Sequence, residues 1–312
     1  MSTTRQPIHT VYGGAHLFRA DTAPRLGVAA LRVLEEYAPD AATLAAVLGI
    51  EPAAAERVHG RVTEKLRREA VEDFRLDFED GYGNRPDAEE DGHAESAAVE
   101  VAAAAHHGTL PPFVGIRIKN LGDELRERAL RTTQLFLDRL LKDTGGQLPP
   151  NFVVTLPKIT QSSQVGLLVD AFARIETIHR LPPGTLRMEL MVETPQTIFD
   201  ETGGVALPAL IKQGRGRIVA AHFGTYDYTA SLGITAAHQH MRHQVCDFAR
   251  GVIQVALAGT GVWLSDGATN ILPVPIHRAV AGQALTVAQL DENRRAVHRA
   301  WRLHHDDIRH SL

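Results

Sequence analysis

The sequence predicts an α/β protein built as a (β/α)8 barrel of the TIM type. Short apolar runs alternate with long amphipathic stretches along the chain, which is typical of parallel strands joined by helical crossovers. Most apolar runs end at a polar or charged residue, and the differences between successive positions are 34 to 41 residues. A βαβ step needs about 30 residues or more, so each interval holds one strand and one helix. The residues at these ends are Asp80, Arg117, Lys158, Glu193, Asp227 and Asp266.

A doubly wound open sheet is the alternative architecture. Its ligands bind at one switch point of the sheet, whereas polar residues here end nearly every predicted strand. Barrel enzymes place their active-site residues at such strand ends, and we therefore favour the barrel. The predicted strands are Val11–Phe18, Phe74–Phe78, Phe113–Ile118, Phe152–Leu156, Leu186–Val192, Arg217–Phe223 and Val262–Leu264.

Amphipathic helices are expected between the strands. In Asp123–Lys142, leucines and alanines form one stripe with arginine and glutamate opposite, as on a helix that packs against a sheet. The other expected crossover helices are Ala94–His107, Gln164–His179, Val205–Gln213 and His238–Ala258.

Two segments depart from this repeat, within a chain that we expect to form one barrel domain over residues 1–312. Residues 21–72 are expected to be a helical insertion after the first strand, and residues 280–312 a helical C-terminal segment. About seven strands remain. An eighth is either formed by residues 271–276, which Pro273 and Pro275 weaken, or is missing with the C-terminal part of the barrel. The additional helices are Leu26–Tyr37, Ala41–Leu48, Pro52–Val71 and Gln289–His310.

Composition excludes several classes of function. A net charge of -4 and a pI of about 6.5 argue against a nucleic-acid or membrane-surface protein, because such proteins carry basic patches. The single cysteine, Cys246, rules out an intrachain disulfide and fits a reducing compartment. Residues 1–9 lack the apolar core of a signal peptide, and no apolar run reaches the length of a membrane span. We expect a cytoplasmic protein.

Two acids that follow neighbouring predicted strands are the candidate metal ligands. Glu193 comes directly after an apolar run and precedes Thr194–Pro195, and Asp227 follows the next apolar run. Two carboxylates with water and substrate oxygens are typical of a magnesium site. The structural alternative is that Glu193 caps a helix and Asp227 is a helix N-cap.

Two cations lie at the ends of the preceding strands. Arg117 stands within a β-branched run, where a buried guanidinium needs an anionic partner. It can hold a substrate carboxylate or stabilise an enolate oxygen, or form a structural ion pair with Glu79 or Asp80. Lys158 can pair with a carboxylate, bind substrate or form a Schiff base; we favour a structural pairing over a Schiff base.

The segment Leu76–Gly83 is dense in acids at a strand end. Strand alternation puts Asp77 and Glu79 on one face and Phe78 and Asp80 on the other. One set of acids then points into the barrel or its mouth and needs a cation, for which Arg117 is the natural candidate. The alternative is a solvated acidic turn.

Histidines offer weaker signals. His222 lies in a predicted strand and either reaches the site as an acid or base or is a buried histidine. His240 and His243 can share a helix face, but zinc needs further ligands, and a solvated helix face is favoured. No nucleotide-phosphate motif and no nucleophile elbow occur in the sequence.

Five segments together resemble the citrate lyase beta-subunit-like and HpcH/HpaI aldolase family. They occur in the family's order and with similar spacing from Arg75 to Gly267. Each segment alone is weak, whereas five in order are specific. The matching segments are Leu76–Gly81 (LDLED in the family), Ile116–Asn120 (RIN), Leu156–Lys158 (LPK), Val192–Pro195 (IETP) and Phe223–Gly233 (GxxDLxxxLG).

This resemblance implies a (β/α) barrel, often oligomeric, that handles metal-bound enolates in aldol or Claisen-type reactions. At the matching positions, Glu193 and Asp227 would bind Mg²⁺ or Mn²⁺, and Arg117 would stabilise the enolate. Glu79 and Asp80 would orient Arg117 or a metal-bound water. The aldolase branch has a histidine base where Asp80 stands here, and the coenzyme A lyase branch has a later GKxxIHP strand that this sequence lacks.

We therefore expect a metal-dependent carbon–carbon lyase or aldolase that acts on a keto-acid-type substrate. The alternatives are an acyl-coenzyme A lyase or malate synthase-like condensing enzyme that binds a coenzyme A thioester, and a non-catalytic binding or assembly protein. Unpaired edges of a seven-stranded barrel also predict a homo-oligomer or a shortened chain. The expected catalytic residues are Arg117, Asp80, Glu79, Lys158 and His222, and the expected substrate contacts are Arg117, Thr194, Gly224, Thr225 and Asp266.

Overall fold

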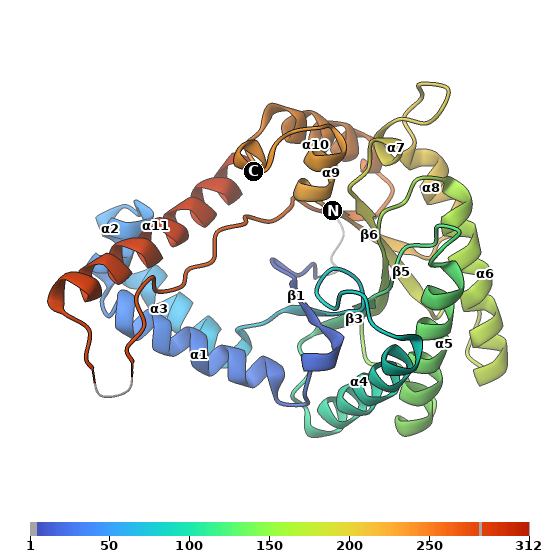
Figure 1. Ribbon diagram of the computed structural model, residues 1–312, viewed down its shortest axis with the longest axis horizontal. Coiled ribbons are helices and arrows are strands. Elements are labelled where there is room, and N and C mark those ends of the chain that lie inside the picture. The colour runs from blue at the N-terminus through green and yellow to red at the C-terminus, as the bar shows by residue number, and fades with distance from the viewer. Residues whose placement is uncertain (1–4, 281–282, 312) are drawn as a thin grey trace. The chain divides into compact units, whose positions relative to one another are not determined.

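Seven parallel strands form one curled sheet in chain order, a half-barrel consistent with an incomplete TIM-type barrel (Figure 1). The computed structural model describes residues 5–280 and 283–311. Every strand pairs only with its neighbours in sequence, as expected when each crossover adds one βα unit. The strands are β1 (Val11–Gly14), β2 (Asp73–Asp77), β3 (Phe113–Arg117), β4 (Phe152–Leu156), β5 (Arg187–Val192), β6 (Ile218–Phe223) and β7 (Trp263–Ser265).

The strand predictions are confirmed, with two corrections. The first strand ends at Gly14, because residues 15–17 turn into the short 3-10 helix η1 (Ala15–Leu17). Residues 271–276 form no strand, so the sheet has no eighth strand within the described ranges. The physical reason is the one anticipated, since Pro273 and Pro275 lack the N–H groups that a ladder requires.

Helices pack on the outer face of the sheet and supply the crossovers. Their apolar stripes meet the apolar strand residues in one core, where Phe136 stacks on Phe152 with ring centroids 6.0 Å apart. Burial of these side chains is the main driving force for this arrangement. The crossover helices are α4 (Asp87–His107), α5 (Arg126–Asp143), α6 (Ser162–His179), α7 (Pro195–Ile198), α8 (Leu207–Gln213), α9 (Thr225–Ser231), η2 (Ala236–His238) and α10 (Gln244–Leu257).

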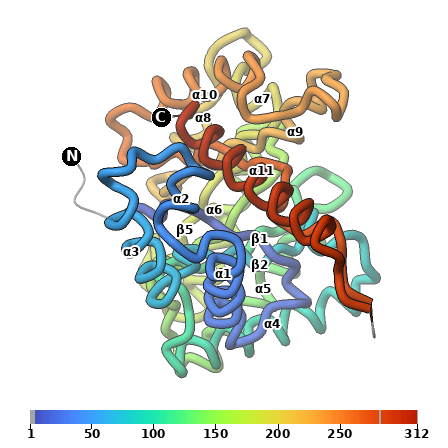
Figure 2. The backbone as a smooth tube through the Cα atoms, turned by 90° about the vertical axis from the view of Figure 1, so that its left-hand side faces the viewer, coloured from blue at the N-terminus to red at the C-terminus, as the bar shows by residue number. Residues whose placement is uncertain are grey.

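The chain divides into two compact units. The first holds the sheet and its crossovers and comprises the chain up to Pro24, Val71–Gln239 and His243–Gly267; the second comprises Arg25–Ala70, His240–Arg242 and the chain from Ala268. The second unit has a small core of its own, and α11 lies beside α2 in it (Figure 2). Its helices are α1 (Thr22–Tyr37), α2 (Ala41–Leu48), α3 (Pro52–Glu69) and α11 (Val287–Ser311). Among the described residues, no helix is long and apolar enough to cross a membrane.

The inner face of the sheet is charged. In β2, Phe74 and Leu76 join the apolar core, whereas Asp73, Arg75 and Asp77 alternate with them and are buried at 0%, 3% and 1% exposure. Alternation along a strand sends these two sets to opposite faces. Buried charges require partners, and the strand register supplies them.

Gly115 gives a test of this packing. A Cβ at Gly115 would lie 2.2 Å from the backbone oxygen of Val153 on β4, and backbone cannot move aside cheaply. We expect Gly115→Ala to lower the free energy of unfolding by at least about 2 kcal/mol, measured by urea denaturation. Gly92→Ala on α4, where a Cβ meets nothing within 4 Å, should instead raise it by about 0.5–1 kcal/mol. Equal effects of the two substitutions would contradict the strand register.

Candidate active site

A buried polar network fills the inside of the curled sheet. Arg75 donates to both carboxylate oxygens of Glu189, at 2.6 and 2.8 Å, and also contacts Asp73. His222 Nε2 lies 3.1 Å from Glu189 Oε2, and its Nδ1 lies 2.9 Å from the Tyr12 hydroxyl. We call these five residues the inner network. Such bidentate, fully paired charges are the form in which ions are tolerated in a protein interior.

Arg117 lies in the next layer, toward the carboxyl ends of the strands. Its Nε and Nη2 donate to the two oxygens of Asp77, at 2.8 and 2.5 Å, and its guanidinium carbon lies 5.0 Å from the centre of the Tyr12 ring. Its Nη1 lies 3.5 Å from Glu79 and 3.4 Å from Asp80. One edge of the guanidinium, Nε with Nη2, is thus committed to Asp77, and Nη1 faces Glu79 and Asp80.

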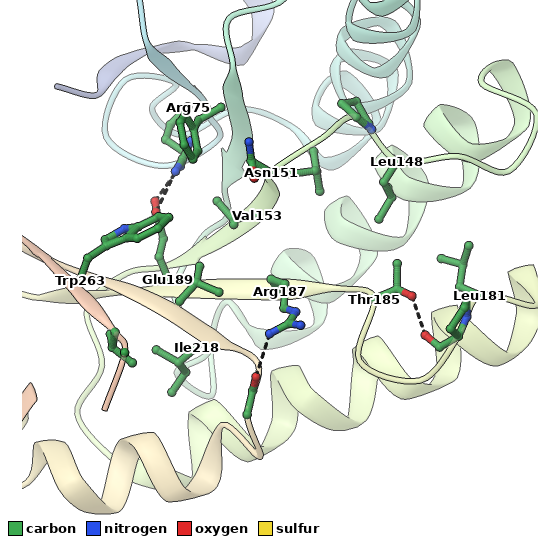
Figure 3. A pocket seen from close by; sticks show the side chains of 18 of the residues that line it. Arg75, Leu148, Asn151, Val153, Leu181, Thr185, Arg187, Glu189, Ile218 and Trp263 are labelled. Atoms are coloured by element: carbon green, nitrogen blue, oxygen red, sulfur yellow. Dashed lines mark hydrogen bonds and ion pairs between the residues drawn. The ribbon is translucent and has the colours of Figure 1, made fainter. Parts of the chain in front are cut away.

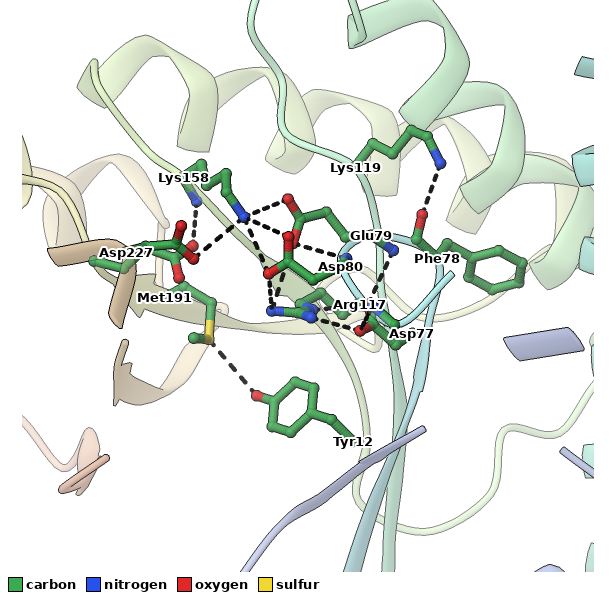
Figure 4. Close-up of polar contacts among 12 residues, drawn as sticks. Tyr12, Asp77, Phe78, Glu79, Asp80, Arg117, Lys119, Lys158, Met191 and Asp227 are labelled. Carbon is green, nitrogen blue, oxygen red and sulfur yellow. Dashed lines mark hydrogen bonds and ion pairs between the residues drawn. The ribbon is translucent and has the colours of Figure 1, made fainter. Parts of the chain in front are cut away.

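Lys158 lies at the centre of the mouth, between Asp227 on one side and Glu79 and Asp80 on the other (Figure 4). Its Nζ is 2.5 Å from Glu79, 3.0 Å from Asp80 and 3.3 Å from Asp227. Its backbone N–H donates to Glu193 Oε1 at 2.7 Å. One residue therefore contacts acids that follow β2, β5 and β6.

We call the mouth cluster the set of acids and cations gathered at these strand ends. It has five carboxyl groups and two cations, so negative charge is in excess. The members are Asp77, Glu79, Asp80, Arg117, Lys158, Glu193 and Asp227.

Glu193 is a buried acid of the mouth cluster with a strongly shifted pKa. Its side chain directly follows β5 and is 1% exposed. Burial raises the pKa of Glu193 to about 7; the charge and backbone N–H of Lys158 oppose this rise, and the charge of Asp227 adds to it. A buried carboxyl that one shared ammonium does not fully compensate holds a proton near neutrality.

The pKa values of Glu79 and Asp80 shift in opposite directions although the two residues are adjacent. Burial raises the pKa of Glu79, and its contacts with Lys158 only partly offset that rise. At the more exposed Asp80, hydrogen bonds from Lys158 and Glu79 outweigh burial and lower the pKa. Pairs of carboxyls whose environments separate their pKa values are the usual basis for assigning an acid and a base.

The loops after β5 and β6 bring the remaining predicted residues near Glu193. The Thr194 hydroxyl donates to the Ile159 carbonyl and fixes the start of α7. A Cβ at Gly224 would lie 2.6 Å from Glu193 Oε2, so glycine there permits the close approach of the Glu193 side chain. Thr225 is 1% exposed, and its Oγ1 has no hydrogen-bond partner among the described residues.

The N-cap alternatives for the two acids do not hold. Thr194 and Gly224 are the N-caps of α7 and α9, whereas Glu193 precedes α7 and Asp227 lies in the first turn of α9. The roles assigned to these acids stay a prediction, but their convergence on Lys158 agrees with it.

The expected strand face of Asp80 needs correction, whereas the roles of His222 and Asp266, which lie apart from the mouth contacts, stay predictions. Asp80 was expected on the opposite face from Glu79, yet both contact Lys158, because β2 ends at Asp77 and alternation stops there. His222 contacts Glu189 and Tyr12 in the inner network rather than the mouth acids. Asp266 follows β7, and within the described ranges its carboxylate forms no hydrogen bond or ion pair with the mouth cluster.

Sequence reasoning missed several residues of the site. Asp77, the bidentate partner of Arg117, was placed in one of the two acid sets that could need a cation, but it was not among the expected site residues. Tyr12, Arg75 and Glu189 of the inner network were not predicted at all. A usable signal was present, since charged and apolar residues alternate strictly over residues 73–77. Charges at every second position of a buried strand indicate a polar interior.

The donor set suits a hard divalent cation. No group of three or more His, Cys, Asp or Glu side chains is arranged as a finished metal site in the part of the chain that the structure describes. However, the acids are oxygen ligands of the kind that Mg²⁺ and Mn²⁺ prefer. The Lys158 ammonium already occupies a cation position among Glu79, Asp80 and Asp227. The residues therefore fit such an ion.

A cavity lies at the end of the sheet opposite the mouth cluster (Figure 3). Its volume is about 1070 Å³, and residues at the amino ends of β3 to β7 line it, including Phe113, Arg187, Ile218 and Trp263. It meets the inner network at Arg75 and Glu189. Sites in barrel enzymes lie at the carboxyl ends of the strands, so we place the candidate site at the mouth cluster and not in this cavity.

Comparison with known proteins identifies a family and a fold. The family profile described as "Domain of unknown function (DUF6986)" matches residues 1–312. No curated protein has a significant sequence match to the chain. A citrate lyase structure from Burkholderia xenovorans LB400 is similar over 94% of this chain and 78% of its own, with 17% identity and a TM-score of 0.50. At this identity the likeness shows a shared fold.

Two further solved structures show weaker likeness. A malate synthase from Haloferax volcanii has 15% identity and a TM-score of 0.47, with 62% of this chain and 53% of that chain covered. This chain thus spans about half the length of that malate synthase. RipC from Yersinia pestis has 15% identity and a TM-score of 0.41, with 63% of this chain and 70% of that chain covered.

The raised pKa of Glu193 predicts that the metal-free protein loses stability as the pH rises from about 4 to about 7. In this range the folded state retains a proton that the unfolded chain, with an ordinary glutamate pKa of about 4.3, has already released. The free energy of unfolding therefore falls with pH. Glu193→Gln should flatten this fall by about 1–3 kcal/mol, measured by urea unfolding across that range. The exposed Glu201→Gln should keep the wild-type slope, and an unflattened slope in Glu193→Gln would disprove the assignment.

Proposed function

This chain belongs to the DUF6986 family, and we propose that it is a magnesium-dependent carbon–carbon lyase or aldolase acting on a keto-acid-type substrate. The observation that supports this most is the convergence of Glu79, Asp80 and Asp227 on one cation position at the carboxyl ends of the strands. Buried Glu193 and Arg117 lie beside it. The five segments that resemble the citrate lyase beta-subunit-like and aldolase family carry these same residues.

Glu193 and Asp227 would hold the divalent cation, Mg²⁺ or Mn²⁺. When bound, the ion would act as a Lewis acid that polarises a substrate carbonyl. The surplus of carboxylates over cations in the mouth cluster supports this assignment, because an added positive charge relieves their mutual repulsion.

Arg117 would stabilise the negative oxygen that develops when the carbon–carbon bond breaks or forms. Asp77 holds its Nε and Nη2, so the guanidinium is fixed before substrate arrives. Its Nη1 pairs with Glu79 and Asp80 at the longer distances of 3.5 and 3.4 Å, and a substrate oxygen would compete for this N–H group. Prepositioned donors of this kind lower the barrier without reorganisation during the reaction.

Glu79 would move the proton. Burial raises the pKa of Glu79, whereas its contacts lower the pKa of the neighbouring Asp80, so Glu79 is the better proton carrier of the two. A general acid works best when its pKa approaches the working pH. His222, the other candidate, belongs to the inner network and would act on Glu189 instead.

The coenzyme A alternative makes a distinct prediction. A thermal-shift screen with coenzyme A, acetyl-coenzyme A and small keto acids separates the two substrate classes, since a ligand that binds only the folded state raises the melting temperature. We expect keto acids with Mg²⁺ to raise it and coenzyme A to leave it unchanged. A rise with coenzyme A alone would favour the condensing enzyme, and Mg²⁺ binding without turnover would favour a binding protein.

We also propose a homo-oligomer. Within the described ranges, β1 and β7 each have a strand neighbour on one side only, and such edges invite pairing with another chain. Sedimentation velocity should show a mass that is a multiple of 34.0 kDa. A single species at the mass of one chain would contradict this.

Removal of both proposed ligands tests the enzyme directly. Glu193→Gln with Asp227→Asn keeps the side-chain shapes but removes two charges, and we expect Mg²⁺-dependent turnover across a panel of keto acids to fall at least about 10³-fold. The control pair Glu124→Gln with Asp123→Asn changes two exposed acids and should leave turnover intact. Unaffected turnover in the first variant would reject the proposal.

A further inference from the structure

The Lys158 ammonium takes the place that a divalent cation would need. It lies within 3.3 Å of carboxylate oxygens from Glu79, Asp80 and Asp227, and these oxygens are the hard ligands of the mouth. Two cations cannot occupy one position, and their charges repel each other strongly at contact distances. Binding of a divalent ion therefore requires the ammonium to leave.

The backbone at Lys158 has an unusual conformation and contacts one of the two proposed metal ligands. Its φ angle is +48°, in the left-handed region that side-chain-bearing residues rarely adopt and that costs free energy. The same residue donates its N–H to Glu193 Oε1 at 2.7 Å. The backbone hydrogen bond to one proposed ligand can persist while the side chain moves, because four rotatable carbons separate the ammonium from the backbone.

From these contacts we infer that Lys158 is a built-in counter-ion of the metal-free site, displaced when a divalent cation binds and then free to pair with the substrate carboxylate. This inference rests on the proposed function and adds an order to it: the metal ion binds first and the anionic substrate second. Each event favours the other, since both draw on the same movement of one ammonium group. A keto acid supplies the anion that the released lysine requires.

A binding experiment tests the competition without any turnover. Free Mn²⁺ is counted by electron paramagnetic resonance during titration of the substrate-free protein. Lys158→Met should bind Mn²⁺ at least about fivefold more tightly than the wild type, because the competing ammonium is gone. Lys142→Met, at an exposed lysine on α5, is the matched control and should bind as the wild type does.

The outcomes separate this inference from the proposed function. If neither wild type nor Lys158→Met binds Mn²⁺ while both remain folded by circular dichroism, the metal site itself is wrong. If the wild type binds Mn²⁺ and Lys158→Met binds it equally or more weakly, the site stands and the displacement is wrong.

A second measurement uses the unmodified protein, so it does not depend on the folding of a variant. Amine labelling with acetic anhydride, read by mass spectrometry, reports which ammonium groups are free of ion pairs. Labelling of Lys158 should rise severalfold when Mn²⁺ is added, while labelling of Lys142 stays constant. Unchanged labelling of Lys158 at saturating Mn²⁺ would overturn the displacement, even if Lys158→Met binds Mn²⁺ more tightly through its lost charge.

Discussion

The surplus of carboxylate over positive charge at the carboxyl ends of the strands is the constraint on which the site depends. Deeper in the sheet, Arg75, Asp73 and Glu189 satisfy one another. At the mouth, Lys158 serves three acids and approaches a fourth through its backbone. Burial raises the pKa of Glu193, and the positive charge of Lys158 does not fully offset this rise. A stronger positive charge beside Glu193 would therefore displace its proton. Negative charge that its neighbours do not neutralise attracts cations.

The polar inner network is unusual for a parallel sheet. Barrel interiors are mostly filled by layers of branched apolar side chains, whereas Tyr12, Arg75, Glu189 and His222 meet here through hydrogen bonds and ion pairs. Bidentate geometry fixes both partners and leaves little freedom for rearrangement. Arg117 is fixed in a similar way. The ring of Tyr12, which belongs to the inner network, lies against its guanidinium, and Asp77 accepts hydrogen bonds from two of its nitrogens.

The periodicity of the sequence predicts most of this fold but only part of the candidate site. Apolar runs predict the bounds of β4 correctly and those of the other strands to within a few residues. They do so because residues on the buried face of a strand or helix recur at a regular spacing in the sequence. The convergence of Glu193 and Asp227 near Lys158 also follows from parallel strands ending at one edge. By contrast, alternation misplaces Asp80, since it holds only as far as Asp77, where the strand ends. The positive φ of Lys158 leaves no sequence signal, because glycine does not occupy that position.

The Arg75–Glu189 layer also sets a depth limit. It lies between the mouth and the cavity of about 1070 Å³ at the other end of the sheet, and it acts as a charged floor. A long apolar chain that entered from the mouth would have to break the ion pair between Arg75 and Glu189. This would leave a buried charge without a partner, which costs much free energy. A short polar acid does not reach this layer and avoids the cost. The ion pair that stiffens the sheet would therefore also favour short ligands over long ones.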